Sequence, residues 1–254
     1  MKIRTAVILC GGSGTRLGQL GKKIPKTLVK IHSRPIIWFI LKTLRNNGFN
    51  HFILPIGFKG NQIKKYIKNN KNFKNFKIEI IETGKKTSIA KRIYRVKKYI
   101  QSENFLLLNG DTIFETNLSK IFSKHEHTKN DLSFISCEAE ADFGTIETIN
   151  GKVVNFQRNL HFGSVQTDKK NYQGYVYSGM VIMNKKILIE NFKNKENFEK
   201  DFFPKIIKKY KSSIIKLSGF WRAMDNMKDI DALNKKSINF YNYNKIKKIL
   251  KKLK

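Results

Sequence analysis

The most constraining feature of the chain is a glycine-rich segment that directly follows its first apolar run. The run Ala6-Val7-Ile8-Leu9-Cys10 has the composition of a buried strand, and it leads into Gly11-Gly12-Ser13-Gly14-Thr15-Arg16-Leu17. Glycines let the backbone turn sharply and aim its N–H groups at one point, where they can bind phosphate oxygens. The spacing fits neither a P-loop nor a dinucleotide-binding turn. The segment therefore predicts a polyphosphate site of another kind, with a plain strand-to-helix turn as the alternative.

The residues after the loop favour the phosphate interpretation. Lys26 follows Arg16 by ten residues, in the segment Ile24-Pro25-Lys26-Thr27. With this continuation the chain resembles the nucleoside-diphosphate-sugar pyrophosphorylases, nucleotidyltransferases that activate sugar 1-phosphates. The signature of that family reads Gly-Gly-x-Gly-Thr-Arg-Leu followed by Pro-Lys, and both parts are present here.

The resemblance extends from about residue 3 to residue 235. Further motifs follow in family order: Pro35-Ile36-Ile37-Trp38, Gly57-Phe58-Lys59-Gly60, Glu82-Thr83-Gly84, Asn109-Gly110-Asp111, and Gly219-Phe220-Trp221-Arg222-Ala223-Met224-Asp225. The Gly-Phe-Lys-Gly step, the helix that carries Arg92-Ile93, and the Phe-Trp-x-x-Met-Asp ending are most similar to the glucose-1-phosphate cytidylyltransferases. CTP is therefore the expected nucleotide, ahead of UTP, dTTP, ATP and GTP.

Strand-like and helix-like segments alternate through the first half of the chain. The expected strands are 3–10, 52–56, 78–81 and 105–108, and the expected helices are 36–47, 61–68 and 87–100. This alternation predicts a mostly parallel sheet with helices on both faces, with ligands bound beyond the carboxyl ends of the strands. Shorter strands at 132–138, 144–149, 153–157 and 174–183 predict an extension of the sheet and a small substrate lobe.

We expect one nucleotidyltransferase domain over residues 1–240, followed by a basic C-terminal helix over 241–254. The resemblance implies an α/β, Rossmann-like (GT-A-like) fold with a nucleotide-binding half over about 1–130 and an acceptor-binding half over about 131–235. In the C-terminal segment the apolar residues Ile246, Ile249, Leu250 and Leu253 recur at helical spacing. This face predicts a helix docked on its own domain, and association with a membrane surface is the alternative.

The resemblance implies nucleotidyl transfer, in which an acceptor phosphate attacks the α-phosphorus of a nucleoside triphosphate and pyrophosphate leaves. Catalysis then depends on positioning and on neutralising the developing charge. Arg16 is expected on the leaving pyrophosphate and Lys26 on the acceptor phosphate. The residues expected to bind the nucleotide are Leu9, Gly11, Gly12, Ser13, Gly14, Thr15, Thr83 and Gly84.

Two carboxylates are candidate ligands for magnesium. Asp111 follows the strand 105–108 and a turn, which places it at the carboxyl end of that strand. Asp225 stands where family members carry their second metal carboxylate. Mg²⁺ usually binds one or two carboxylates and completes its shell with phosphate and water. Without the resemblance, a turn or a helix cap would be the simpler interpretation of each residue.

Two departures from the family pattern bear on the acceptor. Phe156-Gln157-Arg158-Asn159-Leu160 replaces Phe-x-Glu-Lys-Pro, and Tyr177-Ser178-Gly179 replaces Asn-Gly-Gly. Arg158, Ser178 and Gly179 are the candidates for acceptor binding, with Arg158 able to hold a phosphate in a bidentate manner. A hexose 1-phosphate is the first expectation, giving an activated precursor for surface polysaccharide. A non-sugar phosphate used in capsule modification, such as phosphocholine or phosphoglutamine, is the alternative.

The net charge of +32 is the feature that could indicate a different class of protein, because such a charge suits nucleic-acid binding. The lysines are spread along the chain, however, and no nucleic-acid-binding module is recognisable. We therefore expect solvated lysines and no nucleic-acid partner, and keep a basic nucleic-acid-binding protein as an alternative. A catalytically silent homologue is a third reading, against which the intact Arg16, Lys26, Asp111 and Asp225 argue.

No apolar run approaches the ~20 residues that cross a bilayer, and the first residues lead into a strand rather than a signal peptide. We therefore expect a cytoplasmic protein without a transmembrane segment. Cys10 and Cys137 have no metal-ligand partners at short spacing, which predicts two small buried residues. The sequence leaves open whether the chain forms a homo-oligomer.

Overall fold

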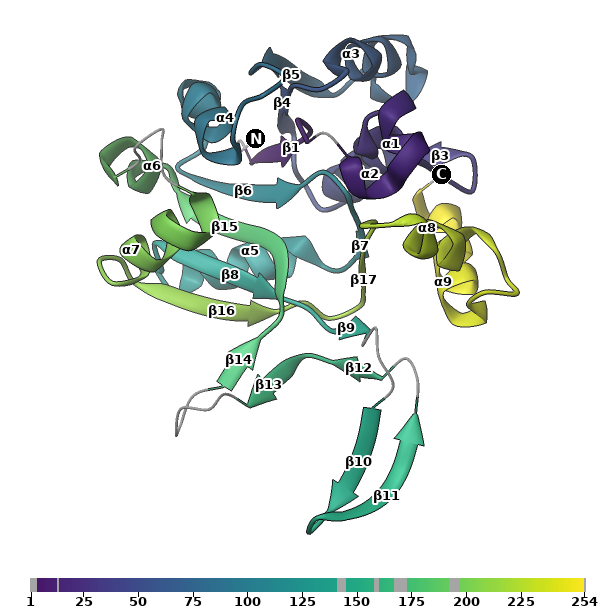
Figure 1. The fold of residues 1–254 in the computed structure, drawn as a ribbon. Helices are drawn as coiled ribbons and strands as arrows, with labels where there is room; N and C mark the ends of the chain where they lie inside the picture. Colours follow the sequence, from purple (N-terminus) through teal and green to yellow (C-terminus); the bar gives the residue numbers. More distant parts are fainter. Residues whose placement is uncertain are drawn as a thin grey trace.

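A seven-stranded sheet runs through the centre of the computed structural model (Figure 1), which describes residues 4–12, 14–140, 145–157, 160–166, 173–191 and 197–253. The strand order is β16-β8-β15-β6-β1-β4-β5. Only β15 runs against the others, so the prediction of a mostly parallel sheet is confirmed. The bounds are β1 Thr5–Leu9, β4 His51–Ile56, β5 Lys77–Glu82, β6 Asn104–Asn109, β8 Leu132–Ser136, β15 Tyr177–Asn184 and β16 Ser212–Lys216.

Helices cover both faces of the sheet, as the alternation of elements predicts. Along β1 the side chains of Ala6 and Ile8 join one buried cluster, whereas Val7 joins the other. The first cluster is closed by α2 Ile36–Asn46, α3 Gly60–Asn69, α5 Leu118–His127, α8 Met227–Asn234 and α9 Phe240–Leu253. The second is closed by α4 Ile89–Val96, α6 Lys185–Asn191, the π-helical turn Phe198–Phe202 and α7 Phe203–Ile207.

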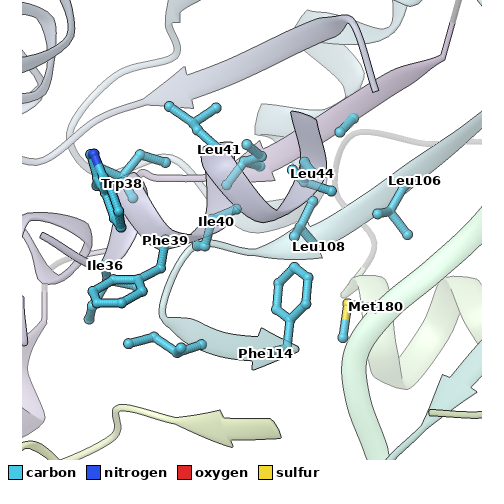
Figure 2. Packing of buried hydrophobic residues seen from close by; sticks show 14 of the residues in the cluster. Ile36, Trp38, Phe39, Ile40, Leu41, Leu44, Leu106, Leu108, Phe114 and Met180 are labelled. Atoms are coloured by element: carbon cyan, nitrogen blue, oxygen red, sulfur yellow. The ribbon is translucent and has the colours of Figure 1, made fainter. Parts of the chain in front are cut away.

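The packing of α2 shows how the sequence fixes the first face. This helix is almost entirely apolar, begins after Pro35 and ends just before Gly48, which has a φ of 83°. Figure 2 shows Leu44 of this helix close to Leu108 of β6, in the same cluster as Leu106, Phe114 and Met180. Because parallel strands are buried on both faces, the apolar runs of β1, β4 and β6 match this environment.

Two predicted elements differ from the structure. The helix predicted over 87–100 is an α-helix only over Ile89–Val96, because Ser88 caps its start and the backbone tightens into a 3-10 turn at Lys97–Tyr99. The strand predicted over 174–183 is two strands, β14 Gln173–Tyr175 and β15, that pair with different partners. Helix α5 was not predicted; its start is capped by the Asn117 side chain.

Short strand pairs extend the molecule beyond the sheet (Figure 1). They are β9 Ala139–Glu140 with β12 His161–Phe162, β10 Thr145–Ile149 with β11 Lys152–Gln157, and β13 Ser164–Gln166 with β14. Near the sheet, β7 Thr112–Glu115 pairs with β17 Phe220–Ala223 and β2 Lys30–Ile31 pairs with β3 Arg34–Pro35. The remaining elements are α1 Gly18–Lys23 and the 3-10 turns Thr15–Leu17, Lys26–Leu28 and Lys71–Phe73.

The C-terminal helix α9 docks on the domain with its apolar face. Ile246, Ile249 and Leu253 are buried in the first cluster, and the Lys245 and Lys252 ammonium groups pair with the Glu115 carboxylate of β7. The apolar face is therefore covered by the protein itself, as the first of the two interpretations predicts. Within the described ranges, no helix has both the length and the apolar character that crossing a bilayer requires.

Candidate active site

A cavity of about 420 Å³ opens at the carboxyl ends of β1 and β6, where the glycine-rich loop lies. The start of the loop is fixed by two backbone contacts. Cys10 forms a parallel β-bridge with Ile56, and the Gly110 N–H donates to the Leu9 carbonyl at 3.2 Å. The cavity is lined by Leu9, Cys10, Gly11, Gly12, Lys26, Thr27, residues 85–89, Arg92, Asn109, Gly110 and Asp111. Its position and its backbone N–H groups suit a polyphosphate with an attached base.

The predicted nucleotide-binding residues occupy different positions around this cavity. Leu9, Gly11 and Gly12 line it, and Gly84 lines a neighbouring cavity of about 400 Å³. Gly14 has a φ of 65° and begins the 3-10 turn that carries Thr15. Thr83 is buried; its hydroxyl donates to the Ile56 carbonyl. Ser13 lies outside the described residues.

Arg92 is a site residue that we did not predict. Its guanidinium is buried behind the loop and donates to Thr83 Oγ1 at 2.6 Å, to the Gly11 carbonyl at 2.9 Å and to the Ile56 carbonyl at 3.2 Å. A Cβ on Gly11 or Gly57 would lie 2.3 Å from this guanidinium, so a side chain at either position would displace it. Burial and the neighbouring Arg95 lower the pKa of Arg92. The signal that could have identified Arg92 from the sequence was its place on the same side of the predicted helix as the apolar residues Ile93 and Val96.

The two predicted cations and the two predicted carboxylates meet at the mouth of the cavity. Lys26 Nζ donates to Asp111 Oδ2 at 2.7 Å and to Asp225 Oδ1 at 2.9 Å, and Arg16 NH1 lies 3.2 Å from Asp225 Oδ1. Burial opposes the charged form of Lys26, but the two carboxylates outweigh it and raise the pKa of Lys26 above its usual value. Arg16 is largely exposed, with 76% of its side-chain surface accessible.

Backbone contacts hold the two carboxylates together. Strand β17 pairs with β7 in antiparallel fashion, and the Met224 N–H donates to the Asp111 carbonyl at 2.9 Å. Asp225 is oriented by the Asp229 carboxylate, which accepts from the Asp225 N–H at 2.9 Å and takes part in the capping box of α8. The pair is therefore built into the fold, although the residues are far apart in the sequence.

The Asp111 and Asp225 carboxylates suit a divalent cation that also binds phosphate. No group of three or more His, Cys, Asp or Glu side chains that could hold a metal occurs in the described part of the chain. Two carboxylate oxygens nevertheless lie within hydrogen-bond distance of the single Lys26 ammonium, which shows that they can surround one cation. Two carboxylates completed by phosphate and water are a donor set that fits Mg²⁺.

Of the three residues predicted to bind the acceptor, the structure describes Ser178 and Gly179. Ser178 is buried, and its hydroxyl donates to the Ile135 carbonyl at 2.7 Å, so this proton is used within the fold. Gly179 has a φ of 75°, and a Cβ there would lie 2.6 Å from Asn109 Nδ2. Gly179 thus allows β15 to approach the end of β6 closely. Arg158 lies outside the described residues.

A third cavity, of about 210 Å³, begins at Asp225 and extends toward the short strand pairs. We call it the β17 cavity; it is lined by Glu138, Ala139, Glu140, His161, residues 219–223, Asp225, Asn226, Asp229, Tyr241 and Asn242. Inside it the Arg222 guanidinium pairs with Glu140 and lies 3.2 Å from Asp229 Oδ1. The predicted cations and carboxylates therefore lie between the β1–β6 cavity and the β17 cavity, an arrangement that suits two substrates.

Comparison with known proteins agrees with this arrangement. The family model for nucleotidyl transferases matches residues 5–238. The chain belongs to the nucleotidyl transferase family. A probable glucose-1-phosphate cytidylyltransferase of Bacillus subtilis (strain 168) is 30% identical over 250 residues, which cover 91% of this chain and 94% of that protein. A D-glycero-alpha-D-manno-heptose 1-phosphate guanylyltransferase of Aneurinibacillus thermoaerophilus is 30% identical over 206 residues, covering 79% and 84% of the two chains.

Solved structures support the fold of this nucleotidyl transferase. HddC from Yersinia pseudotuberculosis complexed with GMP-PN superposes with a TM-score of 0.69 at 24% identity, covering 92% of this chain and 99% of that chain. A putative glucose-1-phosphate thymidylyltransferase from Bacillus anthracis reaches 0.67 at 16% identity, covering 94% and 95%. Both likenesses confirm the α/β fold expected from the sequence. Because the family model matches residues 5–238 and a relative is similar over 91% of the chain, the chain is an enzyme that transfers nucleotidyl groups.

Proposed function

We propose that this nucleotidyltransferase transfers CMP from CTP to a hexose 1-phosphate and releases pyrophosphate, giving a nucleotide-activated sugar. The observation that carries the proposal is the meeting of Arg16, Lys26, Asp111 and Asp225 between the two cavities. The choice of CTP is supported by the cytidylyltransferase-like motifs and by the relative that is similar over 91% of the chain. Such an activated sugar would serve as a precursor for surface polysaccharide.

In this proposal the larger cavity takes the nucleoside triphosphate. The N–H groups of the glycine-rich loop bind the phosphates, and Arg92 holds the loop from behind through the Gly11 carbonyl. Arg16 lies at the open side of the site, where it can meet the pyrophosphate as charge builds on it. Because Arg16 is exposed, it can move toward the leaving group without disturbing the core.

Lys26 and the two carboxylates act at the boundary between the cavities. Lys26 exchanges its carboxylate partners for a phosphate oxygen of the acceptor and so places the attacking oxygen near the α-phosphorus. Asp111 and Asp225 would hold Mg²⁺, which when bound supplies positive charge to the phosphate oxygens. No covalent intermediate with the protein is needed, since positioning and charge neutralisation are enough for this reaction class.

The test is a pyrophosphate-release screen of the five nucleoside triphosphates CTP, UTP, dTTP, ATP and GTP. Each is paired with glucose 1-phosphate, a heptose 1-phosphate, phosphocholine and phosphoglutamine, with and without Mg²⁺. The proposal expects the highest rate with CTP and a hexose 1-phosphate, and none after chelation. A Lys26→Ala variant is the control for contaminating activity.

Each other outcome identifies an alternative. GTP with a heptose 1-phosphate would match the guanylyltransferase relative, which is equally similar over a smaller share of the chain. CTP with phosphocholine or phosphoglutamine would retain the nucleotide and replace the acceptor. Nucleotide binding without turnover would indicate a silent homologue, and salt-sensitive retention on polynucleotide without turnover would indicate a nucleic-acid-binding protein.

A further inference from the structure

Asn109, the last residue of β6, lines the β1–β6 cavity, the cavity of about 420 Å³ beside the glycine-rich loop. It is paired in register with Leu9 of β1, so the two side chains point to the same face of the sheet. Leu9 packs against the second buried cluster, which α4 helps to close. The Asn109 side chain therefore lies on the α4 side of the sheet, where residues 85–89 lead into that helix and line the same cavity.

The Asn109 amide is accessible and is not used by the fold. The residue is half-buried, and its side chain forms no hydrogen bond with the described residues. Neither Oδ1 nor Nδ2 is completely buried, so a molecule in the cavity can reach both atoms. The space next to the amide depends on Gly179 of β15, where a Cβ would lie 2.6 Å from Asn109 Nδ2. A hydrogen-bonding group that the protein leaves unpaired in a cavity is available to a ligand.

The other hydroxyl groups of the described lining are less available. The Thr87 hydroxyl donates to the Thr83 carbonyl, Ser88 Oγ caps the start of α4, and Thr27 Oγ1 is completely buried. Asn109 instead offers two N–H donors and one acceptor oxygen to the cavity. Phosphate and carboxylate oxygens use only the donors, whereas a hydroxyl group can both accept and donate. The amide therefore fits a hydroxyl group of a substrate.

The place of Asn109 in the site indicates which hydroxyl this is. Asn109 stands two residues before Asp111, so their Cα atoms are at most about 7 Å apart. In the proposed function the α-phosphate lies beside Asp111 and Lys26, and the ribose is bonded to the α-phosphate through one oxygen. Asn109 does not line the β17 cavity on the other side of the cluster. The nearest hydroxyl groups are therefore those of the ribose rather than those of the acceptor.

We propose that Asn109 is a specificity-determining residue of this enzyme, whose side-chain amide binds a ribose hydroxyl of the nucleotide. The enzyme then selects nucleotides that carry this hydroxyl, at C2′ or C3′, and binds the corresponding deoxy analogue more weakly. Ribose is common to CTP, UTP, ATP and GTP, so the inference does not depend on the base. It rests on the proposed function in one respect, the binding of a nucleoside triphosphate in the β1–β6 cavity.

The experiment measures by calorimetry, in the presence of Mg²⁺ and without acceptor, the Kd of the best nucleotide from the screen and of its 2′-deoxy and 3′-deoxy forms. Asn109→Leu keeps the branching of the side chain and removes its hydrogen-bonding atoms, and Asn109→Ala is the second variant in case leucine is not accommodated. Asn104→Leu, at the other end of β6 and outside the cavity lining, is the matched control. Tm is recorded for each protein.

We expect both Asn109 variants to weaken nucleotide binding on the order of 10-fold, and removal of the contacted hydroxyl to weaken binding to the wild type by a similar factor. The same analogue should lose little more with Asn109→Leu, because the two changes remove one interaction. The control should bind the nucleotide within about twofold of wild type, even where its Tm changes. A purely structural role for Asn109 would not produce this dependence on one hydroxyl.

Initial rates then separate the two substrates. The nucleotide KM should rise in both Asn109 variants, and the acceptor KM should stay within about twofold. Unchanged nucleotide binding in both variants, equal binding of the nucleotide and both deoxy forms by the wild type, or a rise in the acceptor KM alone would overturn the inference and leave the proposed function standing. Absence of nucleotide binding and of pyrophosphate release by the wild type would overturn both.

Discussion

Arg92 offers the sharpest test of how the nucleotide cavity is built. Replacing it with methionine keeps much of the side-chain length and removes every hydrogen bond of the guanidinium. The two shortest bonds, to Thr83 Oγ1 at 2.6 Å and to the Gly11 carbonyl at 2.9 Å, carry most of the loss. A buried polar group left without a partner costs about 1–3 kcal/mol, so we expect Arg92→Met to lower the free energy of unfolding by about 2–4 kcal/mol. Loosening of the Gly11 backbone should also raise the KM for the nucleotide.

Urea unfolding followed by circular dichroism measures the first effect, and initial rates at saturating acceptor measure the second. Arg95→Met is the matched control, because Arg95 lies almost one turn further along α4, is exposed and donates to the Thr83 carbonyl. It should cost less than about 1 kcal/mol. Arg92→Lys keeps the charge but cannot reproduce the planar set of donors, so it should resemble Arg92→Met rather than wild type. Equal destabilisation by Arg92→Met and Arg95→Met would refute the role assigned to Arg92.

Three further predictions follow from the site and the core. Asp111→Asn or Asp225→Asn should remove most turnover at saturating Mg²⁺ while the circular dichroism spectrum stays unchanged; full turnover in either variant would withdraw that residue as a metal ligand. Arg16→Ala should lower kcat more than it weakens nucleotide binding measured by calorimetry, since the charge it meets grows as pyrophosphate leaves; weaker binding with normal kcat would make it a ground-state contact. Burial lowers the pKa of His125, so the unfolded chain takes up this proton first and stability falls as the pH drops below about 6.5. Urea unfolding should show that His125→Gln weakens this pH dependence and that the exposed His127→Gln does not; equal pH dependence in wild type and His125→Gln would contradict this.

The nucleotide side of the site could be predicted from the sequence because its signals are local. An apolar run that ends in a glycine-rich turn specifies both a buried strand and a backbone able to surround phosphate, and β1 with its loop has this form. The helix α2 was equally clear from an apolar segment preceded by Pro35 and followed by Gly48. The end of α4 was less predictable, because the change from an α-helix to a 3-10 turn at Lys97 leaves the spacing of apolar residues nearly unchanged.

The presence of Asp111 and Asp225 in one site could not have been derived from the residue pattern alone. It depends on the β7–β17 pair and on the Met224 N–H that donates to the Asp111 carbonyl, and no local pattern specifies which short strands will pair. Only the resemblance placed both residues in one site. The β17 cavity had no signal of this kind. Its lining comes mainly from β9, β12, β17, α8 and α9, so these segments line one cavity only after the chain has folded.

The chain as a whole is strongly basic, whereas the two cavities of the site are lined by as many carboxylates as Lys and Arg side chains. A net charge of +32 attracts polyphosphates from a distance, which raises the rate of encounter but places no group with atomic accuracy. Of the 19 acidic residues, Asp111, Asp225, Glu138, Glu140 and Asp229 line the two cavities. In the free enzyme the first two hold the Lys26 ammonium, because a partly buried lysine needs opposite charges nearby. In the proposed mechanism, Lys26 gains new partners when phosphate oxygens enter, and the carboxylates then become free for another cation. In the proposed mechanism, the local acids rather than the net charge therefore determine where positive charge stands during the reaction.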